Sequence, residues 1–305
     1  MEQTKEEIEQ KEAIKQEKSW FDKYYKIMLA IPLVLMLISL VYLGLFYSKH
    51  KDFIYKDVSL SGGTTITLKS IEDTELLEKE LKQDFPDITF RKLTDITTGK
   101  QLAFVIESTS EPEKLKPSIE KILDYKLDEK NSSIEFTGST LSENFYKQLI
   151  IALIISFVLM SIVIFILFRT FIPSIAVLFA AFSDIVMPLA LINILQIKLS
   201  GAGIAAFLML IGYSVDTDIL LTTRALKKRE GLLNQRIFSA FKTGILMTLT
   251  ALAAVLPVFF IITGLPDSFR QIFLILALGL SADIINTWLT NAGIIKWYCD
   301  KKGIK

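Results

Sequence analysis

The chain has 305 residues, 51% of them hydrophobic, and carries 34 lysine and arginine residues against 33 aspartate and glutamate residues. The near balance of charge gives no basis for nucleic-acid binding, and the apolar content argues against a set of soluble domains. The single cysteine, Cys299, excludes an intrachain disulfide, and with His50 as the sole histidine we expect no zinc site, no other metal and no cofactor.

The first residues form a charged tail that precedes a membrane anchor. Residues 1–26 alternate glutamate and lysine, with Glu7 and Lys11 at the i,i+4 spacing of a helix, which predicts a solvated, partly helical cytoplasmic tail. Residues 27–47 are apolar and uncharged over the length that a bilayer requires. This run is too long for the hydrophobic region of a signal peptide, so we expect a retained transmembrane helix.

Residues 48–148 predict a folded extracytoplasmic domain. Alternation and helical periodicity give the order strand, helix, strand, strand, helix, strand, with a turn at Thr98 and Gly99 and with Pro112 in the first turn of the second helix. This βαββαβ order is typical of an α+β ferredoxin-like domain. No catalytic cluster is visible in it, so we interpret it as a docking or moving module and the chain as a non-enzyme.

Five further apolar runs within residues 149–298 complete six expected transmembrane helices. Each run has about 20–25 residues, enough for a helix to cross roughly 30 Å of hydrocarbon. The runs are 149–168, 171–195, 203–222, 243–263 and 272–295. Six spans place the N-terminal tail and the C-terminal tail 299–305 on the same side of the bilayer.

Positive charge is distributed unevenly between the two sides of this topology. Seventeen lysine and arginine residues lie in the tails and in the turns on the tail side, whereas only Lys198 and Arg270 lie in the short loops on the other side. Short cytoplasmic segments carry such an excess of positive charge. We therefore expect a cell-membrane protein with both termini in the cytoplasm.

Four aspartates lie within the apolar spans: Asp184 in span three, Asp216 and Asp218 in span four, and Asp283 in span six. Acidic residues inside a membrane are costly and usually mark ion or proton pathways. A carboxyl group removed from water favours its neutral form, so these residues predict a proton relay. The alternative is that they are structural hydrogen-bonding groups between helices, or are satisfied near the membrane surface.

Asp216 is the preferred relay residue. Residues two apart on a helix point about 200° apart, so Asp216 and Asp218 cannot face one partner. Asp218 is nearer the basic cytoplasmic loop and its water, whereas neighbouring spans three and four would bring Asp184 and Asp216 to a common interior. Lys242, at the start of span five, is either a cation that tunes one of these carboxylates or an anchor at the cytoplasmic surface.

The motif GYSVDTDILLTTR, with FSDIV before it and FKTGILMTLTALAAV and SADIINTWLTNAGI after it, resembles the archaeal branch of the SecF family. SecF is the smaller half of the SecD–SecF protein-export complex, within a superfamily of proton-driven exporters of drugs and lipids. The resemblance covers nearly the whole chain. In bacterial members the proton-site aspartate aligns with Thr217, which is flanked here by Asp216 and Asp218.

The resemblance implies a subunit of the Sec export machinery. It would act with SecD to promote translocation of preproteins through the SecYEG translocon, using the proton gradient through the intramembrane aspartates. Three alternatives stay open: a structural assembly factor of the translocon without ion coupling, a small-molecule or lipid exporter half of the same superfamily, and an intramembrane aspartyl protease. The protease would need a Gly-x-Gly-Asp motif, which is absent before Asp216.

Cysteine labelling tests the predicted topology. In a Cys299→Ser background, single cysteines within 60–140 should react with an impermeant reagent in sealed cells, because the loop charges place this domain outside. Cysteines within 1–20 or 228–240 should react only after permeabilisation. Labelling of the 228–240 loop in sealed cells would contradict the six-span topology.

Overall fold

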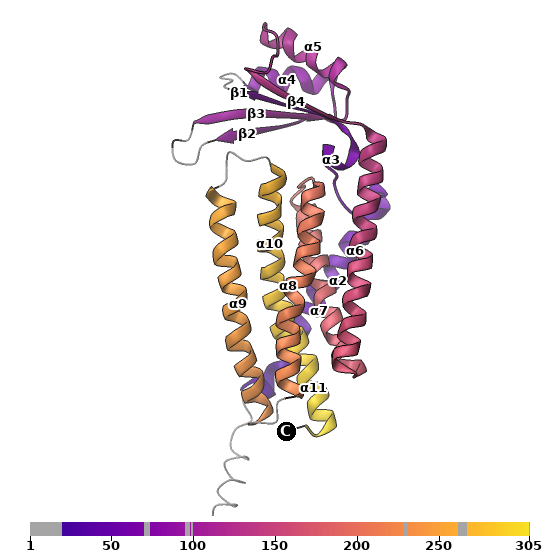
Figure 1. The fold of residues 1–305 in the computed structure, drawn as a ribbon, viewed down its shortest axis with the longest axis vertical. Coiled ribbons are helices and arrows are strands. Elements are labelled where there is room, and N and C mark those ends of the chain that lie inside the picture. Colours follow the sequence, from indigo (N-terminus) through magenta and orange to yellow (C-terminus); the bar gives the residue numbers. More distant parts are fainter. Residues whose placement is uncertain are drawn as a thin grey trace, which may run out of the picture.

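The computed structural model describes residues 20–69, 74–94, 98, 100–227, 231–261 and 267–304. Within these ranges the chain forms a bundle of long helices with a small sheet domain at one end (Figure 1). Residues 1–19 of the predicted tail and Gly99 of the predicted turn lie outside the described residues.

Six helices among the described residues are long and apolar enough to cross a membrane, as the sequence predicts. They are α2 (Trp20–His50), α6 (Ser139–Phe168), α7 (Phe171–Ile194), α8 (Gly201–Leu226), α9 (Leu233–Ile261) and a last span built from α10 (Asp267–Ile285), the π-helix η1 (Asn286–Asn291) and α11 (Ala292–Lys302). Helix α6 begins at Ser139 rather than at residue 149, because its polar first turns continue the helix up to the sheet domain.

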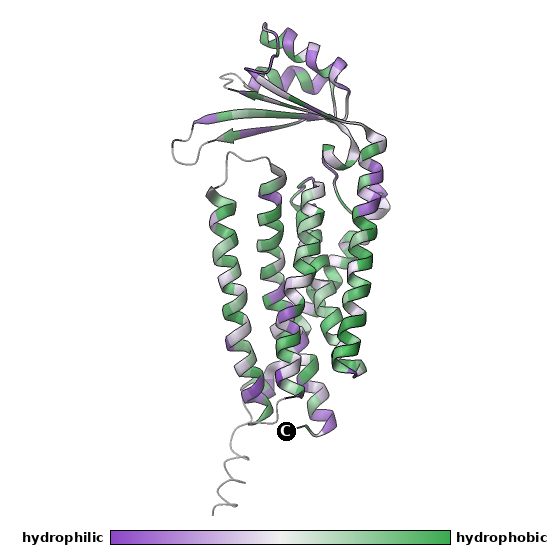
Figure 2. Cartoon of the chain, in the orientation of Figure 1, coloured by the Kyte–Doolittle hydropathy of each residue, from purple (hydrophilic) through white to green (hydrophobic). Residues whose placement is uncertain are grey.

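The helices of the bundle differ in how much of their surface the protein covers. Helices α7, α8 and the last span form its centre and bury about half or more of their apolar windows, whereas α6 and α9 bury 6% and 11%. Figure 2 shows that the bundle is largely hydrophobic, with hydrophilic residues interrupting α8 part-way along its length. Polar side chains in a central helix must find partners inside the protein.

The sheet domain follows the predicted order of strands and helices. Its elements are α3 (Val58–Ser61), β1 (Gly63–Lys69), α4 (Thr74–Asp84), β2 (Thr89–Thr94), β3 (Gln101–Ser108), α5 (Pro112–Leu123) and β4 (Ser132–Thr137). The strands form an antiparallel sheet in the order β2-β3-β1-β4. Ile66 and Leu68 of β1 pair with Ile106 and Phe104 of β3, and all four are fully buried beneath α4 and α5, which cover one face of the sheet (Figure 1).

The base of the sheet domain is hydrogen-bonded to the loop between α7 and α8. The backbone N–H of Asp57 donates to the carbonyl of Leu199 at 3.0 Å, and the N–H of Leu199 donates to the carbonyl of Tyr55 at 2.6 Å. The N–H of Gly201, the first residue of α8, donates to Ser59 Oγ at 3.1 Å. The sheet domain is therefore joined directly to the start of a central helix.

The pH dependence of stability tests the environment of Asp57, whose carboxylate accepts hydrogen bonds from the backbone N–H and the hydroxyl of Ser59. Burial raises the pKa of Asp57 from 3.8 to about 6, despite these hydrogen bonds. A carboxyl group with a higher pKa in the folded state stabilises the fold most at low pH, and this stability is lost as the pH rises from about 4 to about 6.

The loss should reach about 3 kcal/mol at most. Asp57→Asn removes the titrating group, so the unfolding temperature of the wild type relative to the variant should fall over this pH range. A difference that stays constant between these pH values would contradict the assignment.

Candidate functional site: a buried carboxylate cluster

Three of the four intramembrane aspartates meet in the interior of the bundle. Asp184 of α7, Asp218 of α8 and Asp283 of α10 are each no more than 1% exposed. Helices α7, α8 and α10 pack against one another, so the three carboxylates approach from three directions. These residues, hereafter the carboxylate cluster, are three of the candidates predicted from the sequence.

Asp184 and Asp218 accept hydrogen bonds from amide and hydroxyl side chains. Asp184 accepts from Ser214 Oγ and, at 2.7 Å, from Asn286 Nδ2. Asp218 Oδ1 accepts from Asn291 Nδ2 at 2.7 Å, whereas its Oδ2 is buried without a partner. The unpartnered oxygen is a place where a proton or a water could be held.

Threonine hydroxyls surround Asp283. Thr217 Oγ1 lies 3.1 and 3.2 Å from its two carboxylate oxygens, and Thr287 Oγ1 lies 3.0 Å from Oδ1. Thr248 of α9 is more distant, with its Oγ1 3.4 Å from Oδ2. Three helical segments, α8, η1 and α9, therefore supply partners to this one carboxyl group.

The hydroxyl of Thr287 lies between two of the acids. This hydroxyl has one hydrogen, yet a carboxylate oxygen of Asp218 and one of Asp283 each lie 3.0 Å away. It can donate to one of them, and the second contact is a hydrogen bond only if that carboxyl group is protonated and donates back. Thr217 is placed in the same way. Its hydroxyl lies 2.8 Å from the carbonyl of Ser214, which can only accept, so its contact with Asp283 is a second hydrogen bond only if Asp283 is protonated and donates.

The cluster contains no cation to balance its charge. No salt bridge within the described ranges involves Asp184, Asp218 or Asp283. Three ionised carboxylates at such burial would be costly, because burial removes them from bulk solvent and no positive charge among the described residues pairs with them. Proton binding is the simplest way in which these residues can lower that charge.

The π-helix η1 aligns the donors of the last span with the acids. In a π-helix the backbone bonds join residues five apart, so residues at that spacing lie above one another. Asn286 and Asn291 are five apart and donate to Asp184 and Asp218 respectively. Such π segments occur frequently at functional sites.

Asp216 lies outside the cluster, so the prediction that it shares an interior with Asp184 is wrong. Asp216 and Asp218 do point in opposite directions, but Asp218 is the fully buried residue and Asp216 is exposed. Asp216 borders an open hollow of about 540 Å³ that Arg224 and Met247 also line. The expectation that Asp218 reaches water near the loop is likewise wrong, because the last span covers it.

Lys242 is also placed away from the cluster. Its Nζ lies over the ring of Phe238, 4.9 Å from the centroid, and no ion pair of Lys242 with an aspartate is found in the described part of the chain. The arrangement therefore gives no support to Lys242 as a cation that pairs with a carboxylate.

The hydroxyl and amide partners of the cluster were not predicted. They are Ser214, Thr217, Thr248, Asn286, Thr287 and Asn291. The signal for part of this set is present in the sequence, because Ser214, Thr217 and Asp218 follow the three- and four-residue spacing of one helix face. Asp216 falls off that stripe.

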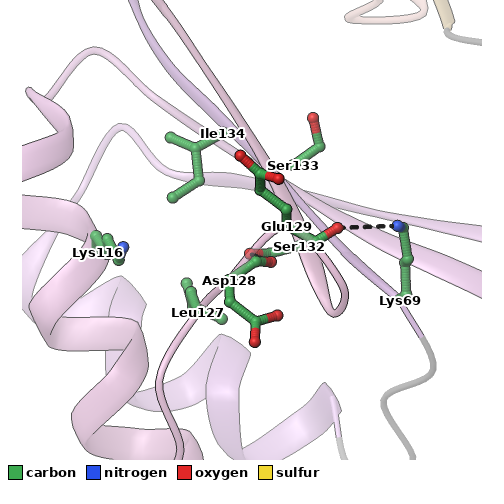
Figure 3. A pocket seen from close by; sticks show the side chains of 8 residues that line it. All are labelled: Lys69, Lys116, Leu127, Asp128, Glu129, Ser132, Ser133 and Ile134. Carbon is green, nitrogen blue, oxygen red and sulfur yellow. Dashed lines mark hydrogen bonds between the residues drawn. The ribbon is translucent and has the colours of Figure 1, made fainter.

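A second, polar hollow of about 480 Å³ lies on the sheet domain (Figure 3). Lys69 borders it and donates from Nζ to the backbone carbonyl of Glu129 at 3.5 Å. The carboxylate of Asp128 accepts from two backbone amides of the adjacent turn, at 2.9 and 3.0 Å. These charges are engaged within the domain, and no group of three or more potential metal ligands is found among the described residues.

The fold and the site together define a polytopic membrane protein with a sheet domain between its first two spans and acids at its centre. Residues 118–301 match the family described as protein export membrane protein SecD/SecF, C-terminal. The protein-export membrane protein SecF of Methanolacinia petrolearia is 38% identical over 91% of this chain and 95% of its own length. SecF of Methanocaldococcus jannaschii is 38% identical over 90% of this chain and 96% of its own length.

The fold has a counterpart of known structure. The crystal structure of SecDF from Thermus thermophilus, a translocon-associated membrane protein, superposes with a TM-score of 0.70 at 16% identity, covering 93% of this chain and 39% of that one. At this identity the match shows the fold alone. With the sequence relatives, it leads to one assignment: the chain belongs to the SecF family of protein-export membrane proteins, which confirms the resemblance predicted from the sequence.

Stability measurements test the difference between the two faces of α8. Asn291→Leu keeps a similar volume but removes the amide that donates to Asp218, so it should destabilise the protein by about 1–3 kcal/mol. Asp216→Asn changes an exposed group outside the cluster and should not destabilise the protein. Buried Cys299 provides the readout, because a thiol-reactive dye labels it only as the protein unfolds in detergent. Equal unfolding temperatures for the wild type and Asn291→Leu would contradict the site.

Proposed function

We propose that this chain is the SecF subunit of a Sec export complex, which acts with SecD to promote the passage of preproteins through the SecYEG translocon. The proposal is supported by relatives that are named protein-export membrane proteins and by the fold shared with a translocon-associated SecDF. It includes coupling to the proton gradient through the carboxylate cluster.

The contacts of the Thr287 hydroxyl carry the proposal of proton coupling. One hydrogen serves two carboxyl groups there, so the set of hydrogen bonds depends on how many protons the acids hold. Loss of that proton would leave Asp218 and Asp283 both as acceptors and would force a donor to change partner. Proton binding and helix packing are linked in this arrangement, as a proton-driven protein requires.

The location of the protein belongs to the same proposal. Both termini lie in the cytoplasm, and the sheet domain is a ferredoxin-like module on the outer face of the cell membrane. The excess of lysine and arginine on the tail side supports the orientation. The order of strands and helices supports the type of domain.

Asp216 marks the face that we assign to SecD. It is exposed in the membrane-spanning part of α8, and within the described residues it has no hydrogen bond or ion pair. An acidic group at lipid depth without a partner is costly, so a polar group of another chain would stabilise it. Arg224 in the same hollow is already engaged, donating to Ser239 and Thr243 of α9.

Export assays with matched variants test this proposal. Membrane vesicles containing SecYEG, SecD and this chain should show gradient-dependent export in the wild type. Asp218→Asn and Asp283→Asn keep side-chain size but cannot ionise, so each should reduce export to the level measured without a gradient. Asp216→Asn should retain the gradient dependence while less SecD co-purifies with the chain.

Labelling of Cys299 in folded and heated samples controls for misfolding of each variant. Wild-type export by Asp218→Asn, Asp283→Asn and the double variant would make the carboxylates structural and would favour an assembly factor without ion coupling. Loss of gradient dependence in Asp216→Asn alone would identify Asp216, and not the carboxylate cluster, as the proton-binding residue.

A further inference from the structure

An apolar pocket lies at the end of the bundle opposite the sheet domain. Its volume is about 370 Å³, and the beginning of α2, the first part of α9 and η1 form its walls. Its lining residues include Phe21, Asn234, Phe238, Phe241, Trp288 and Ala292. The volume lies within the range of small-ligand sites, and the walls are those of a site for a hydrocarbon group.

Two buried polar atoms of the lining have no partner. Trp288 is 6% exposed, and its indole Nε1, which can only donate, makes no hydrogen bond. Asn234 donates from Nδ2 to Asp22 Oδ2 at 2.7 Å, but its Oδ1 is buried without a donor. Leaving such groups unpaired costs free energy, so a ligand that supplies an oxygen acceptor and a hydroxyl would bind more tightly than a hydrocarbon alone.

A positive charge lies beside the pocket. The ammonium group of Lys242 is exposed and stacks over the ring of Phe238, one of the lining residues, 4.9 Å from its centroid. No ion pair of Lys242 occurs among the described residues. An anion at this position would complement the charge of Lys242 and accept from Trp288 Nε1, whereas Asn234 Oδ1 needs a hydroxyl that donates to it.

We propose that the pocket binds one membrane lipid with an acidic headgroup. A hydrocarbon chain occupies the apolar walls, an oxygen near the headgroup accepts from Trp288 Nε1, a headgroup hydroxyl donates to Asn234 Oδ1, and the phosphate lies at Lys242. A helix of another protein is a poorer occupant. A helix with its side chains is about 10 Å wide, and a pocket of about 370 Å³ is too small to enclose a helical segment of several turns. The proposal of a lipid site does not rest on the proposed export function.

Lipid binding here would act on the carboxylate cluster through η1. Trp288 follows Thr287, whose hydroxyl contacts both Asp218 and Asp283. The indole ring of Trp288 packs against Gly244 of α9, where an added Cβ would lie 2.4 Å from the ring. A lipid that holds the other side of the indole would restrict the position of η1.

Quenching of tryptophan fluorescence by brominated lipids tests the site. The chain has three tryptophans, so Trp20→Phe with Trp297→Phe leaves Trp288 as the sole reporter, and Trp20→Phe with Trp288→Phe leaves Trp297. Trp297 is the matched control because it is 41% exposed and also has a lysine, Lys301, 5.2 Å from its ring centroid. Both proteins are placed in phosphatidylcholine bilayers with increasing fractions of brominated phosphatidylglycerol.

Trp288 should reach half-maximal quenching at a mole fraction about fivefold lower than Trp297 does, and Lys242→Gln should abolish this preference. Lys227→Gln, which changes a lysine beside Phe168, should leave it unchanged. Ala292→Leu fills the pocket and should make Trp288 resistant to brominated lipid. Equal quenching of Trp288 and Trp297, or equal quenching of Trp288 by brominated phosphatidylcholine, would overturn the proposal.

Discussion

The hydroxyl of Thr287 lies 3.0 Å from a carboxylate oxygen of Asp218 and 3.0 Å from one of Asp283, and the centre of the bundle is organised around this shared contact. In an apolar interior each polar group must find its partner within the protein. Three helices therefore have to meet at one depth, with serine, threonine and asparagine facing the acids. The packing of α7, α8 and the last span follows from this requirement, while α6 and α9 remain free to cover the outside.

One helix connects this centre to the sheet domain. Helix α8 begins at Gly201, whose N–H is bonded to Ser59 at the base of the sheet domain, and carries Ser214, Thr217 and Asp218 further along. A helix transmits a displacement along its axis with little loss, because its backbone bonds lie parallel to that axis. Asp218 and the base of the sheet domain are thus connected through a single helix.

The sequence predicts the architecture better than it predicts the site. Apolar runs of bilayer length identify six spans, and alternation such as that around Ile66 and Leu68 identifies the strands, because both patterns are set by local burial. Helix periodicity shows that Asp216 and Asp218 oppose each other, but only the packing of α10 decides which one is buried. The polar stripe through Ser214, Thr217 and Asp218 contains that information. The π-helix was not predicted, and its two asparagines find their partners on α7 and α8, which are distant in sequence.

The π-helix η1 also gives the last span a surplus of residues over a regular α-helix. The backbone bonds of its six residues join residues five apart, one more than in an α-helix, so each such turn contains an additional residue. Conversion of η1 to α-helical geometry would pass one residue of register along the chain. The following helix α11 would then rotate by about 100° and shift by about 1.5 Å along its axis. Thr287 lies within η1, where such a conversion would begin, and Lys296 and Cys299 lie on α11, the helix that would be displaced.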